Sequence, residues 1–209
     1  MNNLRFKSST ASYLTAILLT GATFAAACNS AAPPRAIEDS ANSTSAQRLQ
    51  KSIPPRDQQA IESASNVQVT KLDGGTFKLS DFRGKVVVVD FWATYCEPCK
   101  KLVRNLAALD KKYRDRGLEV VGLTSDDQEN EKLVQDFLKK YDADYTVGYE
   151  NQWLSKAFLK GTEDETYSPP IPQVFVISRD GRVVDHFIGE TPQGMTELEQ
   201  VVNQQLASR

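Results

Sequence analysis

The chain has 209 residues, 40% of them hydrophobic, and its 25 Lys and Arg against 27 Asp and Glu give a formal net charge of −2. This composition supports one globular domain of ordinary size, and it excludes the surplus of basic residues that a nucleic-acid-binding surface needs. The single histidine, His186, argues against catalytic triads and against metal sites built from several histidines.

The first 28 residues are typical of a secretory signal peptide. Arg5 and Lys7 precede an uncharged run, residues 13–27, which ends in three alanines directly before Cys28. The run is too short to indicate a stop-transfer helix. Small residues before a cysteine resemble a bacterial lipobox, although an alanine stands where a lipobox usually has leucine. We therefore expect Cys28 to carry a lipid that anchors the protein on a membrane face outside the cytoplasm; the alternative is simple cleavage next to an incidental cysteine.

Residues 29–65 predict a flexible tether. They are dominated by Ala, Ser, Pro and polar residues, with few large apolar side chains, so the segment cannot bury enough surface to offset its chain entropy. A tether of this kind lets a globular head reach away from a membrane. Within it, residues 57–65 have the composition of a short helix. The composition changes at residue 66, so we place the folded domain at residues 66–209.

From residue 66 onward, predicted strands and helices alternate. The first element is a hairpin, in which apolar residues alternate in 67–72 and 76–82 on either side of the turn DGG. The run KVVVVDFWA, residues 85–93, is typical of a strand that is covered on both faces. The later elements are a helix over 96–116, a strand over 118–125, a helix over 133–141, a short strand over 143–149, a short helix over 151–159, a hairpin of 173–178 and 182–189, and a helix over 195–206. This order indicates parallel pairing in the middle of the sheet and antiparallel strands at its end, so we expect an α/β fold with a mixed sheet.

Cys96 and Cys99 follow the buried strand, at the start of the next helix. Free N–H groups and the helix dipole favour an anion at a helix N-terminus, so the thiol of Cys96 should lose its proton easily. Cys99 lies one turn further along the same side, within reach of a mixed disulfide on Cys96, and Pro98 is tolerated in a first helical turn. This arrangement suits thiol–disulfide exchange.

The other interpretations of the pair are a purely structural disulfide and a metal site. Zinc takes four ligands, whereas residues 66–209 offer two cysteines and one distant histidine. Attachment of haem requires a histidine directly after the second cysteine, and Lys100 occupies that position. We therefore expect no metal, and thiol–disulfide exchange needs no small-molecule cofactor.

Three stretches of the chain, VVVVDFWATYCEPCK, SPPIPQVFVISRDGRVV and FIGETPQGMTELEQVV, resemble the TlpA/ResA-like thiol–disulfide oxidoreductases, which are membrane-anchored proteins with a thioredoxin fold. The similarity extends over residues 66–209 in order and spacing. The resemblance implies a central mixed sheet flanked by helices, with the first hairpin as an N-terminal extension.

The resemblance assigns a role to each matching position. Cys96 matches the attacking nucleophile and Cys99 the resolving cysteine, so together they form the redox-active disulfide. Pro172 matches a cis-proline that faces the pair, since a cis X–Pro bond makes a tight turn. In this family the backbone of the residue before it, here Ile171, can pair with an extended substrate segment.

Three further positions are expected to bind substrate. Trp92 and Tyr95 would flank the cysteines, and Gly189 falls in a loop that lines the same groove. The structural alternatives are that both aromatic residues cap the core, that the prolines of this region only punctuate a loop, and that Gly189 only makes a turn.

The chain departs from the family pattern at three positions. Asp90 stands where thioredoxins have a buried aspartate and TlpA/ResA-like proteins often have asparagine. Burial would raise its pKa, so that it can take the proton of Cys99 as that thiol attacks; the alternative is a hydrogen-bonded aspartate at a strand end. Leu102 stands where ResA-like proteins carry a glutamate, whose role therefore does not transfer. Tyr95 replaces the commoner tryptophan.

The predicted function is an extracytoplasmic thiol–disulfide oxidoreductase that reduces disulfides in substrate proteins. A membrane-bound thiol donor would recharge the pair, and cytochrome c biogenesis, with apocytochrome c as substrate, is one setting that the resemblance implies. One alternative is a thiol peroxidase of the peroxiredoxin class, which usually has Pro-x-x-x-Thr/Ser-x-x-Cys, and the segment before Cys96 lacks that proline. The other is a non-enzymatic binding module on the same fold, against which the intact cysteine pair argues.

Overall fold

The computed structural model describes residues 55–159 and 169–208. The predicted signal peptide, the predicted anchor Cys28 and the predicted tether up to residue 54 therefore lie outside the described residues. Within the described ranges, none of the helices has the length and apolar character that crossing a membrane requires.

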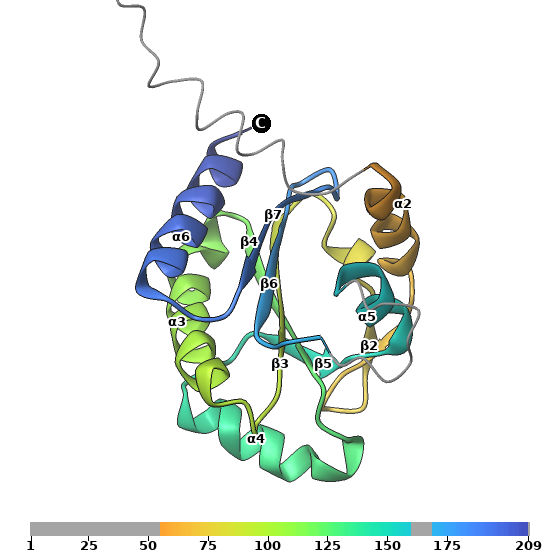
Figure 1. The fold of residues 1–209 in the computed structure, drawn as a ribbon, viewed down its shortest axis with the longest axis vertical. Coiled ribbons are helices and arrows are strands. Elements are labelled where there is room, and N and C mark those ends of the chain that lie inside the picture. The colour runs from red at the N-terminus through yellow and green to blue at the C-terminus, as the bar shows by residue number, and fades with distance from the viewer. Residues whose placement is uncertain (1–54, 160–168, 209) are drawn as a thin grey trace, which may run out of the picture. The chain divides into compact units, whose positions relative to one another are not determined.

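The centre of the domain is a five-stranded sheet with the strand order β5-β4-β3-β6-β7 (Figure 1). The strands are β3 (Val86–Trp92), β4 (Leu118–Thr124), β5 (Thr146–Tyr149), β6 (Gln173–Ile177) and β7 (Val183–Ile188). β3, β4 and β5 pair in parallel, whereas β6 runs antiparallel to both β3 and β7. The mixed sheet predicted from the order of elements is confirmed, and β3 is its central strand, with all of its residues buried.

Helices cover both faces of this sheet (Figure 1). One face packs against α3 (Glu97–Tyr113), α4 (Glu131–Lys140) and α6 (Pro192–Ala207). The other face packs against α2 (Pro55–Ala64) and α5 (Gln152–Phe158). The sheet therefore separates two hydrophobic cores.

Strand β3 supplies side chains to both cores, because successive residues of a strand point to opposite faces. The residues that pack on the α3 side are Val86, Val88 and Trp92, and those that pack on the α5 side are Val87, Val89 and Phe91. Asp90 belongs to the first set by this alternation, so its carboxyl lies on the same side of the sheet as the cysteine pair.

Helix α2 corrects the predicted domain boundary. The sequence predicts a flexible tether through residue 65, but α2 packs against the domain, and its Ile61 is only 1% exposed. The side chain of Gln58 donates a hydrogen bond to the carbonyl of Gly181 and accepts one from the N–H of Val183. The average composition of the segment does not indicate these contacts, which are one buried isoleucine and two hydrogen bonds to the β6–β7 hairpin. The folded domain includes residue 55 onward.

The N-terminal hairpin is shorter than predicted. β1 (Val69–Thr70) and β2 (Thr76–Phe77) form a separate two-stranded antiparallel sheet. The chain then turns into a 3-10 helix, Leu79–Phe82, where the sequence predicts a continued strand. Two more 3-10 segments, Arg114–Arg116 and Gln128–Asn130, lead into β4 and α4.

Candidate active site

The two cysteines form a disulfide at the N-terminus of α3. Cys96 is the N-cap residue of the helix, the Cα atoms of Cys96 and Cys99 are 5.3 Å apart, and their sulfurs are bonded. Cys96 is 8% exposed, whereas Cys99 is 0% exposed. Cys96 is therefore the more accessible residue of the pair, in keeping with the expected division into attacking and resolving cysteines.

The turn that leads into the pair is fixed by Asp126, a residue that the sequence analysis did not single out. Its carboxylate accepts hydrogen bonds from the backbone N–H of Thr94 at 2.8 Å and from the Thr94 hydroxyl at 2.6 Å. It also accepts one from the hydroxyl of Thr124, the last residue of β4, at 2.7 Å. The sequence could have indicated Asp126 as a site residue. An aspartate just after a buried parallel strand lies at the edge of the sheet where the neighbouring parallel strand also ends, which is a recurring place for functional residues.

The loop before β6 faces the same sulfur. The Ile171–Pro172 peptide bond is cis, which confirms that prediction. The carbonyl oxygen of Ile171 lies 3.7 Å from the sulfur of Cys96. Gly189, directly after β7, donates its N–H to the carbonyl of Pro172 at 2.9 Å and has a φ of +77°, which favours glycine. The structure thus brings together Cys96, Ile171, Pro172 and Gly189 from three separate parts of the chain.

The two aromatic residues expected to flank the pair lie in different environments. Tyr95, next to Cys96, is 73% exposed and is free to contact another molecule. Trp92 is 0% exposed and stacks on Phe137 of α4, with ring centroids 4.9 Å apart. The expectation that Trp92 binds substrate is therefore wrong for this structure, because its position on β3 points it into the core beneath the pair.

Asp90 is fully buried and has no hydrogen-bond partner in the structure for either carboxylate oxygen. Burial raises the pKa of Asp90 from 3.8 to about 8, because the charged form loses its hydration. The predicted raised pKa is confirmed, and the alternative of a hydrogen-bonded strand-end aspartate is not what the structure has. Burial also raises the pKa of Tyr145, and the negative charge of Asp90 adds to that effect, so the two groups influence each other.

Leu102, one turn after Cys99, is 2% exposed. It therefore supplies an apolar contact at the position where the resemblance would place a glutamate. Among the described residues, no group of three or more His, Cys, Asp and Glu side chains is arranged to hold a metal ion. The site therefore holds the cysteine pair, with the buried carboxyl of Asp90 on the same side of the sheet.

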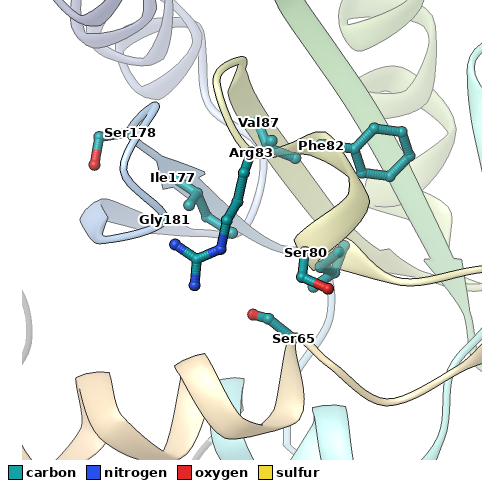
Figure 2. A pocket seen from close by; sticks show the side chains of 9 residues that line it. Ser65, Ser80, Phe82, Arg83, Val87, Ile177, Ser178 and Gly181 are labelled. Atoms are coloured by element: carbon teal, nitrogen blue, oxygen red, sulfur yellow. The ribbon is translucent and has the colours of Figure 1, made fainter.

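A hollow of about 20 Å³ lies at the Ile177 end of β6 (Figure 2). Cys96 contacts the loop at the other end of this strand. Arg83, Ser65 and Ser178 are among the residues that line it. The guanidinium of Arg83 and both hydroxyls already donate hydrogen bonds to neighbouring protein groups. The volume is close to that of a single water molecule, so this hollow is not a competing active site.

Comparison with known proteins gives one consistent picture. Residues 58–204 match the family model described as Redoxin. Thiol-disulfide oxidoreductase ResA of a Bacillus cereus strain is 38% identical over 136 residues, which cover 64% of this chain and 72% of that protein. ResA of Bacillus subtilis (strain 168) is 30% identical over 132 residues, which cover 63% of this chain and 69% of that protein. The crystal structure of a thiol:disulfide interchange protein from Chlorobium tepidum TLS aligns with a TM-score of 0.57 and 25% identity, covering 69% of this chain and 95% of that one.

Proposed function

Since the chain belongs to the redoxin family and is a TlpA/ResA-like thiol–disulfide oxidoreductase with a thioredoxin fold, we propose that it reduces disulfides of substrate proteins outside the cytoplasm. The observation that carries this proposal is the disulfide at the start of α3, whose more exposed sulfur belongs to Cys96 and lies against the loop of Ile171. The two sulfurs of the pair are the donors of two electrons in each cycle.

The proposed cycle begins with the reduced pair. The thiolate of Cys96 attacks one sulfur of the substrate disulfide, which forms a mixed disulfide and releases the other substrate sulfur as a thiolate. Cys99 then loses its proton and attacks the sulfur of Cys96. This step releases the second substrate thiol and leaves the Cys96–Cys99 disulfide, which is the state seen in the structure.

Asp90 is proposed as the acceptor of the Cys99 proton. Its carboxyl is buried on the α3 side of the sheet, which is also the side of Cys99, and its pKa of about 8 lies near that of a thiol. A proton passes easily between groups of similar pKa. The ionised carboxyl of Asp90 can therefore take the proton of Cys99, and the negative charge then lies on the sulfur that attacks.

The substrate is proposed to lie along the loop before β6. The backbone of Ile171 would pair with an extended segment, since its carbonyl already faces the sulfur of Cys96. The exposed ring of Tyr95 and the turn at Gly189 would complete the contact surface. The sulfur to be attacked would then be positioned over Cys96.

The proposed location and partners are supported by the N-terminal sequence. A signal peptide over 1–28 and a lipid on Cys28 would place the domain at a membrane outside the cytoplasm. A membrane-bound thiol donor would then return electrons to the oxidised pair. Apocytochrome c is one substrate to test, although the buried Leu102 takes the place of the family's glutamate.

Trapping of the mixed disulfide tests this function. The Cys99→Ala variant lacks the resolving thiol, so substrates should stay bonded to Cys96 and be released by dithiothreitol. The Cys96→Ala variant is the matched control and should capture nothing. Failure to capture any protein, together with efficient consumption of peroxide by the wild type, would replace the proposal with the thiol peroxidase alternative.

A further inference from the structure

The side chain of Gln173, the first residue of β6, connects the active-site loop to β7. Gln173 is 4% exposed, and its amide nitrogen donates a hydrogen bond to the carbonyl of Pro170 at 2.8 Å. Its amide oxygen lies 2.8 Å from Nε2 of His186. The two contacts form a continuous link from the single histidine of the chain to the loop that faces Cys96.

The direction of both hydrogen bonds is fixed by the chemistry of the groups. A carbonyl only accepts, so the amide nitrogen of Gln173 must face Pro170 and its oxygen must face His186. An amide oxygen also only accepts, so Nε2 of His186 must carry a hydrogen. Burial lowers the pKa of His186, which favours the neutral ring. The neutral ring is then the tautomer protonated at Nε2.

The ring of His186 is itself held in place by β6. His186 is the direct partner of Phe175 in the antiparallel pairing, and their rings stack with centroids 4.1 Å apart and planes 5° apart. Gln173 and Phe175 are two residues apart on β6, so their side chains lie on the same face of the sheet. The imidazole of His186, whose Nε2 donates to Gln173, is therefore held in place by stacking on the ring of Phe175.

The loop that receives the link has few hydrogen-bond donors of its own. Pro170 and Pro172 lack an N–H, which leaves Ile171 as the single backbone donor of the three residues. The loop is tied to the β7 side at two points, by the Gln173 amide at Pro170 and by the Gly189 N–H at Pro172. Ile171, whose carbonyl lies against the sulfur of Cys96, is between these two ties.

We propose that His186 and Gln173 are positioning residues that hold the Pro170–Pro172 loop in place for docking of an extended substrate beside Cys96. His186 touches neither sulfur and acts only through Gln173. The proposal rests on the function proposed above, because it concerns the loop that would bind the substrate. It concerns binding of a peptide backbone and leaves the chemistry of the cysteine pair unchanged.

The test compares two substrates and four variants of the full-length protein, which are three single substitutions and one double substitution. His186→Phe keeps an aromatic ring over Phe175 but has no donor, whereas His186→Gln keeps an N–H that can reach Gln173. With a linear peptide carrying a cysteine in mixed disulfide with glutathione, His186→Phe should raise KM about fivefold, which is the effect of losing one net hydrogen bond. It should leave kcat unchanged, and His186→Gln should restore most of KM. With hydroxyethyl disulfide, which has no peptide backbone to dock, all rates should equal those of the wild type.

Two further measurements test whether His186 acts on the Pro170–Pro172 loop through Gln173. Gln173→Met should raise KM at least as much as His186→Phe, and combining the two changes should add nothing further, because they break the same link. Hydrogen exchange of the Gly189 amide, followed by NMR without any substrate, should be faster in His186→Phe and normal in His186→Gln. Additive effects, an equal rise in KM for both substrates, or unchanged exchange at Gly189 would overturn the proposal. A wild-type protein that reduces neither substrate would instead refute the proposed function, while the exchange measurement would still decide whether the link holds the loop.

Discussion

Asp90 on β3 lies directly opposite Gly122 on β4 in the parallel pairing of the two strands. A Cβ atom at Gly122 would lie 2.8 Å from the indole nitrogen of Trp92 and 3.1 Å from the ring of Tyr145. The glycine therefore allows both rings to approach the strand next to the carboxyl. The indole nitrogen and the Tyr145 hydroxyl are, like the carboxyl oxygens, buried without a hydrogen-bond partner in the structure. Burial of this kind is costly for the fold, and it raises the pKa of Asp90.

Replacement of Asp90 should slow the resolving step without abolishing it. Asp90→Asn removes the proton acceptor but leaves Cys96 at the helix N-terminus, so we expect roughly 10-fold to 100-fold slower release of the reduced substrate. Because the carboxyl ionises near pH 8, the difference from the wild type should grow between pH 6 and pH 9. Stopped-flow reduction of a mixed-disulfide substrate measures this step, with Asp136→Asn, an exposed aspartate on α4, as the control. Equal rates for wild type and Asp90→Asn at every pH would show that the proton leaves through water.

The same carboxyl should make the stability of the oxidised protein depend on pH. The folded pKa of Asp90, about 8, lies above its ordinary value of 3.8, so between these values the folded state keeps a proton that the unfolded chain has lost. The free energy of unfolding should therefore fall as pH rises through this window, by about 1.4 kcal/mol per pH unit from this group alone. Asp90→Asn lacks this contribution and should be the more stable protein at pH 7. Urea unfolding of both proteins at several pH values between 5 and 8 measures the difference, and parallel curves would contradict the prediction.

Helix α2 should be required for full stability. Ile61→Ala removes a side chain that is 1% exposed, which typically costs about 2–5 kcal/mol in the free energy of unfolding. Gln59→Ala, at an exposed position of the same helix, is the matched control and should change the stability little. A protein truncated to residues 66–209 should lose at least as much stability as Ile61→Ala. The prediction fails if the truncated protein and the protein of residues 55–209 unfold at the same urea concentration.

Cys28 should carry the lipid. Cys28→Ser should remain unprocessed or become soluble, whereas titration of the Cys96–Cys99 pair should not change, because the anchor takes no part in the redox chemistry. Mass spectrometry of the intact protein from the membrane fraction measures the modification. A disulfide between Cys28 and either cysteine of the pair would rule out lipidation at this residue.

The sequence predicted the parts of the fold that depend on local pattern. The continuous apolar run of β3 and the alternation of strands and helices were sufficient for the mixed sheet. The boundary at residue 66 was wrong, because α2 folds against a hairpin that lies far along the chain, and composition carries no information about such a partner. Trp92 was expected to flank the cysteines and bind substrate, with a core position as the alternative. It alternates in step with Val86 and Val88, and that alternation places it in the core.

The side-chain links of the site were beyond prediction for a different reason. The contact of Gln173 with His186 depends on the register of the β6–β7 pairing, which includes an irregularity between Val176 and Ile177. A register is set by the packing of the whole sheet, so it cannot be read from two residues that are 13 positions apart. The role of Asp126 was more accessible, since strand ends that meet at one edge of a sheet are a recurring place for functional residues.

The pairing of β3 with β6 has a consequence for how this protein can diversify. Phe91, just before the turn that leads to the cysteines, is the direct partner of Gln173, just after Pro172. Cys96 and Ile171, in the loop that faces it, are 75 residues apart in the chain, yet they are joined through one pair of hydrogen-bonded strand residues. Insertions or deletions after β5 can therefore change the length and the surface of the intervening chain while the spacing between sulfur and loop stays the same. Related proteins should accordingly differ most in that intervening stretch, where new substrate preferences can arise without rebuilding the redox centre.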